Sequence, residues 1–204
     1  IEFQKNISSS KDLKLLNEIF SISSLELVKL ALEYSNNLFI ETLVLKATGE
    51  KTLETAAAKV IKELNLSVTG KLENSSGLSA QTKIKASDMA MFIRKNAFKR
   101  FGNNYFINLL SITGHSGSLY KKYLTKSGFE KYRYKTGSLD YVYNICGQSF
   151  ELNQKTFCVM INNPKKRTLL MGENSVKLES LRQEAKAWRR SKERFSELLL
   201  NEIN

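Results

Sequence analysis

Histidine, proline and cysteine are scarce in this sequence, and their scarcity excludes several kinds of site. The 204 residues contain one histidine, His115, so we expect neither a histidine-based metal site nor a Ser-His-Asp triad. The two cysteines, Cys146 and Cys158, are too few for a disulfide framework or for a zinc site with two Cys and two His. The single proline leaves no proline-rich linker. We therefore expect no metal and no cofactor.

Long apolar runs are also missing. No segment approaches the length of a membrane-spanning helix. The first residues, Ile1-Glu2-Phe3-Gln4-Lys5, show neither an initiator methionine nor the apolar core of a signal peptide, which indicates an expression or processing boundary. Hydrophobic residues make up 42% and charged residues 25%, as in an ordinary globular protein with a real core.

Positive charge is abundant. The net charge of +12 is typical of a protein with an anionic partner, although solubility alone explains it equally well. Residues 165–194 carry ten Lys/Arg against four Glu, a net charge of +6. This C-terminal segment predicts a helix that packs on the core, with an anionic membrane surface or wall polymer as a possible partner. No aromatic-basic signature of an RNA-binding sheet is present, so we expect no nucleic acid.

Helical spacing of apolar residues predicts five main helices, at 25–34, 38–48, 52–64, 87–101 and 175–203. Ser87-Asp88 is the expected cap of the fourth helix, and the last helix is expected to bury Leu181, Ala185, Trp188 and Phe195. Shorter pieces are expected at 12–21 (a strand), 66–69 (extended), 105–110 and 119–126 (both helical).

Two long strands are predicted, at 132–146 and 155–162, with a hairpin turn at 150–154. Helices followed by a hairpin and a further helix predict an α+β fold in which helices pack on an antiparallel sheet. Because two strands alone make a marginal sheet, we infer that partner strands are missing and that this is only part of a parent domain. Residues 1–163 would belong to that domain, and the basic helix at 164–204 would pack on it.

The start of the first long strand carries Lys135-Thr136-Gly137. Gly137 has no Cβ, so another backbone can come close to this edge. Lys135 and Thr136 offer a cation and a hydroxyl beside that gap. A separate turn, Ser35-Asn36-Asn37, interrupts two helices 100 residues earlier and offers a hydroxyl and an amide.

These motifs belong to a series that runs in a fixed order. The tracts are Tyr34–Glu41 (YSNNLFIE), Ser76–Ser79 (SGLS), Gly114–Leu119 (GHSGSL), Lys135–Leu139 (KTGSL) and Phe157–Asn163 (FCVMINN). In this order the series resembles the C-terminal half of the low-molecular-mass penicillin-binding proteins with D-alanyl-D-alanine carboxypeptidase/endopeptidase activity. The resemblance covers residues 22–163 and implies a penicillin-binding protein/β-lactamase-like fold. It also implies an extracytoplasmic location in the periplasm or cell envelope.

The resemblance implies a serine acyl-transfer mechanism on peptidoglycan stem peptides, with β-lactam antibiotics acylating the same serine. Ser35 would be the relay hydroxyl, Asn37 the amide that contacts substrate, and Lys135 a fixed positive charge. Thr136 and Gly137 would bind substrate, with the Thr136 hydroxyl on its terminal carboxylate. The backbone N–H of Ser138 would be an oxyanion donor.

The family's nucleophile, in a Ser-x-x-Lys motif, lies far upstream of Ser-x-Asn. Ser8-Ser9-Ser10-Lys11 fits that pattern literally but lies only 27 residues before Ser35, and Leu13, Leu15 and Ile19 after it alternate as in a strand. We interpret this match as a coincidence and expect the nucleophile outside this sequence. A β-lactamase-like hydrolase and a basic, non-catalytic module that binds an anionic polymer or nucleic acid are the alternatives.

Cys146 and Cys158 are expected to face each other across the second hairpin if its turn centres on Leu152 or Asn153. We favour two packed thiols here. A cross-strand disulfide is the alternative, and it would suit an extracytoplasmic compartment.

Overall fold

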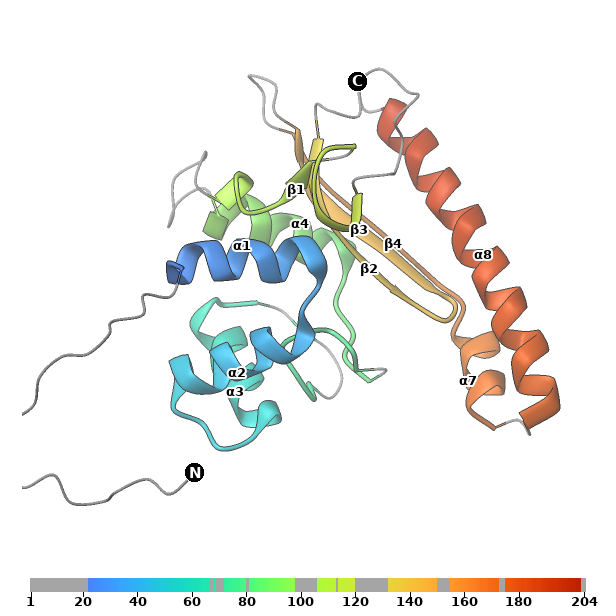
Figure 1. Cartoon of the computed structure of the whole chain (residues 1–204), viewed down its shortest axis with the longest axis horizontal. Helices are drawn as coiled ribbons and strands as arrows, with labels where there is room; N and C mark the ends of the chain where they lie inside the picture. Colours follow the sequence, from blue (N-terminus) through green and yellow to red (C-terminus); the bar gives the residue numbers. More distant parts are fainter. Residues whose placement is uncertain are drawn as a thin grey trace, which may run out of the picture.

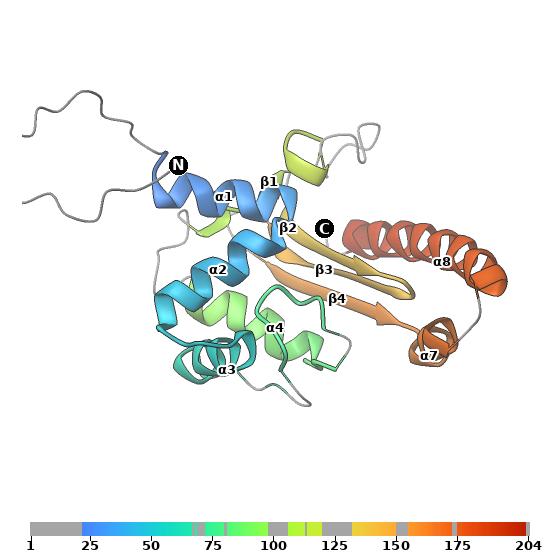
Figure 2. The same ribbon diagram turned by 60° about the horizontal axis from the view of Figure 1, so that its bottom comes forward.

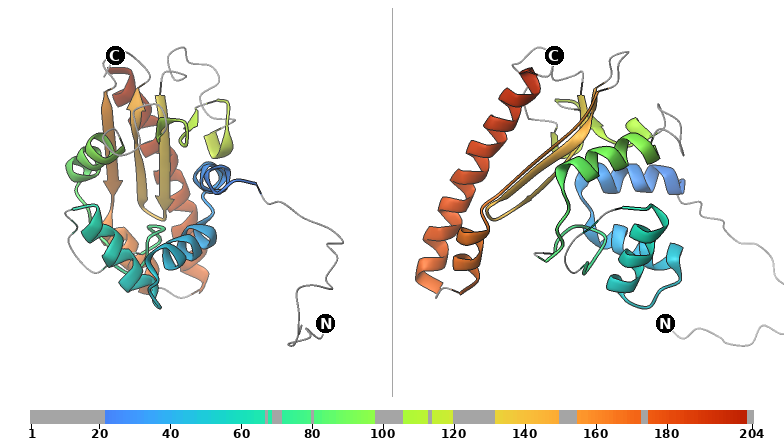
Figure 3. Two further views of the ribbon diagram at one scale, coloured as in Figure 1. Left: turned by 90° about the vertical axis from the view of Figure 1, so that its left-hand side faces the viewer. Right: turned by 180° about the vertical axis from the view of Figure 1, so that it is seen from behind.

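The computed structural model describes residues 22–66, 68, 72–79, 81–97, 106–112, 114–119, 132–149, 155–172 and 175–202. An antiparallel sheet lies between two groups of helices (Figure 1). Helices α1 to α4 lie on one side of it and the long C-terminal helix α8 lies on the other, as two further views also show (Figures 2 and 3). The α+β prediction is confirmed.

Three of the predicted helices form where their capping residues place them. Helix α1 (Ser24–Tyr34) begins at a capping box in which the hydroxyl of Ser23 accepts from the N–H of Glu26 and the Glu26 carboxylate accepts from the N–H of Ser23. Helix α2 (Asn37–Thr48) ends at the left-handed Gly49. Helix α3 (Leu53–Glu63) begins after Thr52, whose hydroxyl accepts from the N–H of Thr55.

The fourth helix differs from its prediction. Helix α4 spans Ala86–Phe92 and continues as a π-helical turn, η2 (Ile93–Ala97). Lys85 occupies the N-cap position without a side-chain cap, so Ser87 and Asp88 lie inside the first turn and the predicted Ser-Asp cap is wrong. Several predicted segments lie wholly or partly outside the described residues: 12–21, residues 67 and 69 of the extended piece, and the parts of 87–101 and 119–126 beyond 97 and 119.

Four strands form the sheet in the order β1-β2-β3-β4: β1 (Ser111–Ile112), β2 (Tyr132–Leu139), β3 (Val142–Ser149) and β4 (Thr156–Asn162). The prediction of one strand over 132–146 is wrong, because the chain turns back at Asp140 and Tyr141, and Tyr141 adopts φ +57°. Large side chains alternate on both sides of this turn, so the sequence pattern did not reveal it. The inference that the chain carries only two long strands is wrong for the same reason.

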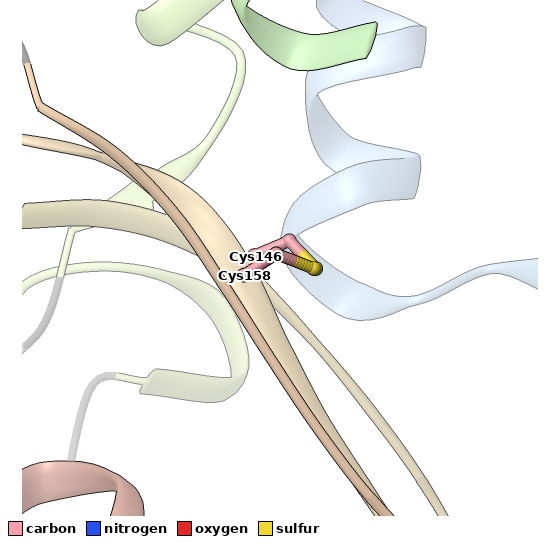
Figure 4. Close-up of a disulfide and its surroundings, with 2 residues drawn as sticks. All are labelled: Cys146 and Cys158. Atoms are coloured by element: carbon pink, nitrogen blue, oxygen red, sulfur yellow. A yellow bond between two sulfur atoms is a disulfide. The ribbon is translucent and has the colours of Figure 1, made fainter. Parts of the chain in front are cut away.

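The second hairpin has the register expected from the sequence. Cys146 lies directly opposite Cys158 on β3 and β4. The two residues form a disulfide (Figure 4), so the favoured prediction of two packed thiols is wrong. The segment 150–154 that was predicted as the turn lies outside the described residues.

One face of the sheet packs against α8. Its buried cluster includes Tyr132, Tyr134, Ile145 and Phe157, and Leu200 of α8 closes it. The hydroxyl of Tyr132 donates to the carbonyl of Leu200 at 3.3 Å, and the ring of Phe157 meets the Tyr132 ring edge-on at 5.6 Å between centroids. Because these residues recur at every second position, the residues between them lie on the opposite face.

Helices α7 (Pro164–Gly172) and α8 (Ser175–Glu202) complete the chain. Helix α8 buries Ala185 and half-buries Trp188, as expected, but Phe195 keeps 49% of its surface exposed, so its predicted burial is wrong. Ser196 and Leu200 fill the buried positions near that end. No described helix has the length and apolar character to cross a membrane.

We predict that a side chain at Gly147 of β3 destabilises the hairpin formed by β2 and β3. A Cβ there would lie 2.1 Å from the carbonyl oxygen of Arg133 and 2.5 Å from the Cβ of Tyr134. Gly147→Ala should therefore lower the free energy of unfolding by about 1–3 kcal/mol, measured by urea denaturation. Gly137→Ala is the matched control, since the nearest atom to its added Cβ is 3.9 Å away. Equal stability of the two variants would contradict this packing.

Candidate active site

The two motifs that the sequence analysis singled out meet in space. The ammonium of Lys135 on β2 donates a hydrogen bond to the hydroxyl of Ser35, which lies 100 residues earlier at the end of α1. The strand and the inter-helix corner therefore converge in the structure. The catalytic roles assigned to these residues stay predictions.

The backbone at Ser35 is unusual. Ser35 adopts φ 53° and ψ 49°, a left-handed conformation that non-glycine residues rarely take and that clusters at functional sites. It ends α1 while Asn36 begins α2 by accepting a hydrogen bond from the N–H of Phe39 at 3.0 Å. The connection between the helices is thus reduced to two residues, and this short corner presents the Ser35 hydroxyl to β2.

Lys135 is the first residue of β2 beyond its pairing with β1. Strand β1 pairs only with Arg133 and Tyr134, so within the described residues the edge of β2 beyond them has no strand partner. The Lys135 ammonium also donates to the carbonyl oxygen of Thr136 at 3.0 Å, which places that carbonyl on the open edge. Lys135 is half-buried, and desolvation of its ammonium lowers its pKa below the ordinary lysine value.

The residues after Lys135 present backbone groups to this edge. Backbone direction repeats every second residue in a strand, so Ser138 points its N–H and C=O to the same edge as Thr136. Gly137 is exposed, and the space around its absent Cβ is open enough for a ligand to approach. Because neighbouring side chains of a strand point to opposite faces of the sheet, Thr136 and Lys135 lie on different faces. The Thr136 hydroxyl and the Lys135 ammonium can therefore contact the same ligand only if that ligand lies along the open edge of β2.

Asn37 was expected to be the last residue of the turn, but it is the first residue of α2. It is half-buried, and its amide makes no hydrogen bond to any residue that the structure describes. Its position two residues from Ser35 leaves this amide available to a ligand at the same corner.

Glu41, the last residue of the Tyr34–Glu41 tract, has a structural role that the sequence did not predict. Its carboxylate accepts hydrogen bonds from the backbone N–H groups of Ser75 at 3.1 Å and Ser76 at 2.7 Å. A second carboxylate, Glu73, accepts from the hydroxyl of Ser79 at 2.6 Å. Helix α2 therefore fixes both the Ser35 corner and the loop that contains Ser76–Ser79. Glu41 lies 34 and 35 residues before its two partners, so the contact leaves no local signal in the sequence.

The loop at 114–119 supports α1 from the other side. Gly117, with φ +56°, lies so close to α1 that a Cβ on it would be 2.5 Å from the carbonyl oxygen of Glu33. Leu119 is buried in the sheet core, which ties the loop to β2. This close approach holds the last turn of α1, and hence Ser35, next to the sheet.

The disulfide shares a cross-strand row with the site lysine. Lys135 lies opposite Cys146, and Cys146 lies opposite Cys158, so all three side chains are on the same face of the sheet. Figure 4 shows the bonded pair on the two neighbouring strands. The disulfide thus links β3 to β4 directly beside the strand position that holds Lys135.

This corner suits an anionic or carbonyl-bearing ligand. It combines a fixed ammonium, a hydroxyl that it contacts, a free amide and an open strand edge with N–H donors. Among the described residues, no group of three His, Cys, Asp or Glu could hold a metal ion.

Comparisons with known proteins bear on the family and the fold of this chain. A model of the D-Ala-D-Ala carboxypeptidase 3 (S13) family matches residues 3–180. A structure of penicillin binding protein 4 (dacB) from Haemophilus influenzae, complexed with a novel β-lactam, is similar with a TM-score of 0.56 and 21% identity over 67% of this chain and 34% of that chain. A second structure of the same protein gives a TM-score of 0.55, again at 21% identity, over 67% of this chain and 33% of that chain.

At this identity the two structures show a shared fold. This chain spans about a third of the length of those solved structures. A search of curated proteins found no match.

We predict that Glu41 orders the loop of Ser75 and Ser76. Glu41→Ala removes a charged acceptor of two N–H groups, so amide hydrogen exchange at these residues should accelerate by about tenfold to a hundredfold. Glu41→Gln keeps one acceptor oxygen and should give an intermediate rate. Glu63→Ala, an exposed carboxylate on α3, is the control. Unchanged exchange in Glu41→Ala would show that the carboxylate does not hold the loop.

We also predict that Lys135 titrates at lower pH than an ordinary lysine, because burial disfavours its charged form. The ¹³C shift of reductively methylated Lys135, assigned by its loss in Lys135→Arg, reports the titration midpoint. This midpoint should lie below that of the same lysine in urea-unfolded protein. A midpoint equal to or above the unfolded value would contradict the desolvated environment.

Proposed function

The chain belongs to the D-Ala-D-Ala carboxypeptidase 3 (S13) family, and from this premise we propose that it forms the substrate-holding part of a serine-type D-alanyl-D-alanine carboxypeptidase/endopeptidase. The contact between Lys135 and Ser35 beside the open edge of β2 is the observation that supports this most. It joins the two motifs whose convergence the acyl-transfer mechanism requires.

In this proposal the substrate peptide lies along the open edge of β2. The Lys135 ammonium and the Thr136 hydroxyl attract the terminal carboxylate of the stem peptide, since a half-buried positive charge next to an open edge favours an anion there. The N–H of Ser138 donates to the oxyanion that forms when the peptide carbonyl is attacked. The Asn37 amide orients the substrate, and Gly137 leaves room for it.

The nucleophile is a serine of a Ser-x-x-Lys motif outside these 204 residues. Its hydroxyl gives its proton to the lysine of the same motif and attacks the carbonyl between the two D-alanines, the peptide C–N bond breaks, and D-alanine leaves after it has received this proton. Ser35 relays that proton, because its hydroxyl already contacts a lysine and can both accept and donate. Water then hydrolyses the acyl-enzyme. Ser8 and Lys11, the literal match in this sequence, lie outside the described residues.

The same geometry fits β-lactam antibiotics, which carry a carboxylate and a reactive carbonyl. A peptidoglycan substrate places the protein outside the cytoplasm, in the periplasm or cell envelope. The Cys146–Cys158 disulfide supports this placement, because disulfides persist in oxidising compartments.

Acylation by a fluorescent penicillin tests the proposal in the longest polypeptide that the natural gene encodes. We predict one acyl adduct, located by peptide mass spectrometry on a Ser-x-x-Lys serine. Ser35→Ala and Lys135→Ala should each slow acylation by about 100-fold or more, because they remove a proton relay and a fixed charge. Stable adducts indicate a peptidase, whereas rapid turnover of the β-lactam indicates a β-lactamase-like hydrolase.

The matched controls are Ser191→Ala and Lys46→Ala, both exposed on helices. These variants, and Ser8→Ala, should acylate like the unmodified protein. An adduct on Ser8 would refute the assignment of the nucleophile. Normal acylation rates in both Ser35→Ala and Lys135→Ala would remove these residues from the mechanism.

A further inference from the structure

We propose that the side-chain amide of Asn144 on β3 donates a hydrogen bond, above Gly137, to the carboxylate of a ligand that Lys135 attracts. This inference rests on the proposed function, because it takes the terminal carboxylate of the stem peptide as the ligand. It adds a substrate-contacting residue that lies outside both sequence motifs of the site.

Asn144 lies on the face of the sheet that carries the site lysine. Across β2 and β3, Asn144 is directly opposite Gly137, and residues that are directly opposite share a face. Lys135 lies two residues before Gly137, and strand positions two residues apart also share a face. Asn144 and Lys135 are therefore diagonal neighbours, about 7–8 Å apart along this face.

Packing does not explain an asparagine in the interior of β3. Asparagine is depleted in strands, because its amide competes with the backbone for hydrogen bonds and favours turns. Its neighbours Tyr143 and Ile145 are buried in the core beside α8, so Asn144 is directed to the opposite face. The position therefore calls for a role on the side of the sheet where the site lies.

The cross-strand row gives the amide no partner. Gly137 has no side chain, and Met160, which is opposite Asn144 on β4, offers only a thioether, a weak acceptor. Asn144 is half-buried, and its amide makes no hydrogen bond with any residue that the structure describes. A ligand that pairs with this amide would restore a hydrogen bond that the protein does not supply.

The space above Gly137 is open to such a ligand. A Cβ on Gly137 would lie 3.9 Å from the Cβ of Asn144 and 4.0 Å from its Nδ2, which are ordinary contact distances. Gly137 itself is exposed. Because a hydrogen bond spans about 2.9 Å, an oxygen atom just above Gly137 comes within reach of the Asn144 amide after a small shift.

The charge of Lys135 lies on the other side of this space. Its ammonium donates to the carbonyl oxygen of Thr136 at 3.0 Å, and this carbonyl belongs to the peptide bond that joins Thr136 to Gly137. The ammonium is therefore beside Gly137 at the open edge of β2, while Asn144 is beside Gly137 toward β3. A carboxylate above Gly137 has one oxygen for each donor, and charge-assisted hydrogen bonds of this kind are short and strong.

This arrangement favours a donor role for the amide. An asparagine can donate through its Nδ2 or accept through its Oδ1. The neighbouring ammonium makes an anion the preferred occupant of the space above Gly137, and an anion accepts hydrogen bonds. The site should therefore select a ligand with a free carboxylate over the corresponding ester or amide.

Acylation kinetics test this selection in the longest polypeptide that the natural gene encodes. Asn144→Ala should slow acylation by a penicillin by about tenfold, because a donor to a charged group is lost. Asn144→Asp keeps an acceptor, loses the donor and adds a like charge, so it should slow acylation by about 100-fold. The methyl ester of the same penicillin lacks the negative charge, and either substitution should change its rate by less than about threefold.

The matched controls are Asn162→Ala and Asn162→Asp. Asn162 is exposed on the same face of the sheet, but it lies on β4, which β3 separates from the site strand. Both controls should acylate like the unmodified protein. An Asn144→Asp variant that reacts faster than Asn144→Ala would show that the amide accepts from the ligand, and this would overturn the proposal. Equal losses with the penicillin and with its ester would also overturn it.

Gly137→Ala tests the space between the two donors. Its methyl group would meet Asn144 at an ordinary contact distance, so the fold should be kept while the ligand is blocked from the amide. In the Gly137→Ala background, Asn144→Ala should therefore cost less than about twofold. A full tenfold cost in that background would show that Asn144 does not act through this space.

Binding without chemistry separates this inference from the proposed function. In the 204-residue chain, the side-chain ¹⁵N–¹H signals of Asn144, assigned by their loss in Asn144→Ala, should shift with a D-alanyl-D-alanine peptide but not with the C-terminal amide of that peptide. A peptide that shifts the backbone N–H signal of Ser138 but not the Asn144 signals would overturn only this inference. A peptide that shifts neither would refute the carboxylate site, and with it both proposals.

Discussion

The hydrogen bond from Lys135 to Ser35 is the interaction on which the organisation of the site depends. It requires three local features at once. Ser35 adopts a left-handed conformation that ends α1 and turns its hydroxyl toward the sheet. Strand β2 has an open edge from Lys135 onward, because β1 pairs with only two of its residues. Gly117 lets the loop at 114–119 approach the last turn of α1 closely enough to hold it there. The first and third features position Ser35, and the second leaves Lys135 accessible beside it. The contact between the two residues needs all three.

Side chains along β2 alternate between the two faces of the sheet, one packed on α8 and the other directed to the helices that carry Ser35. Tyr132 and Tyr134 point toward α8 and form the apolar core, while Arg133 and Lys135 point toward the helices that carry Ser35. Burial of the first set makes the strand rigid, and this rigidity positions the second set. The same division places the Ser35 corner and α8 on opposite sides of the sheet (Figure 3).

The sequence predicted secondary structure well where the signal was local, and it failed where the outcome depended on how the elements pack together. Capping residues such as Ser23, Thr52 and Gly49 gave the helix ends, because caps act within four residues. The turn at Asp140 and Tyr141 was missed because large side chains alternate on both sides of it, and one strand and two paired strands then have the same pattern. Phe195 was expected to be buried because it fits the helical spacing, but Ser196 and Leu200 occupy the positions that face the sheet.

The sequence by itself determined helices α1, α2 and α3, the register that sets Cys146 opposite Cys158, and the order of motifs that indicated the family. These depend on spacing along the chain, which is written in the sequence. Only the tertiary structure decided that Lys135 contacts Ser35, that Glu41 holds the N–H groups of Ser75 and Ser76, and that the two cysteines are bonded. These contacts join residues that are 12 to 100 positions apart. Their distances follow from the packing of the helices on the sheet, and no periodicity in the sequence encodes them.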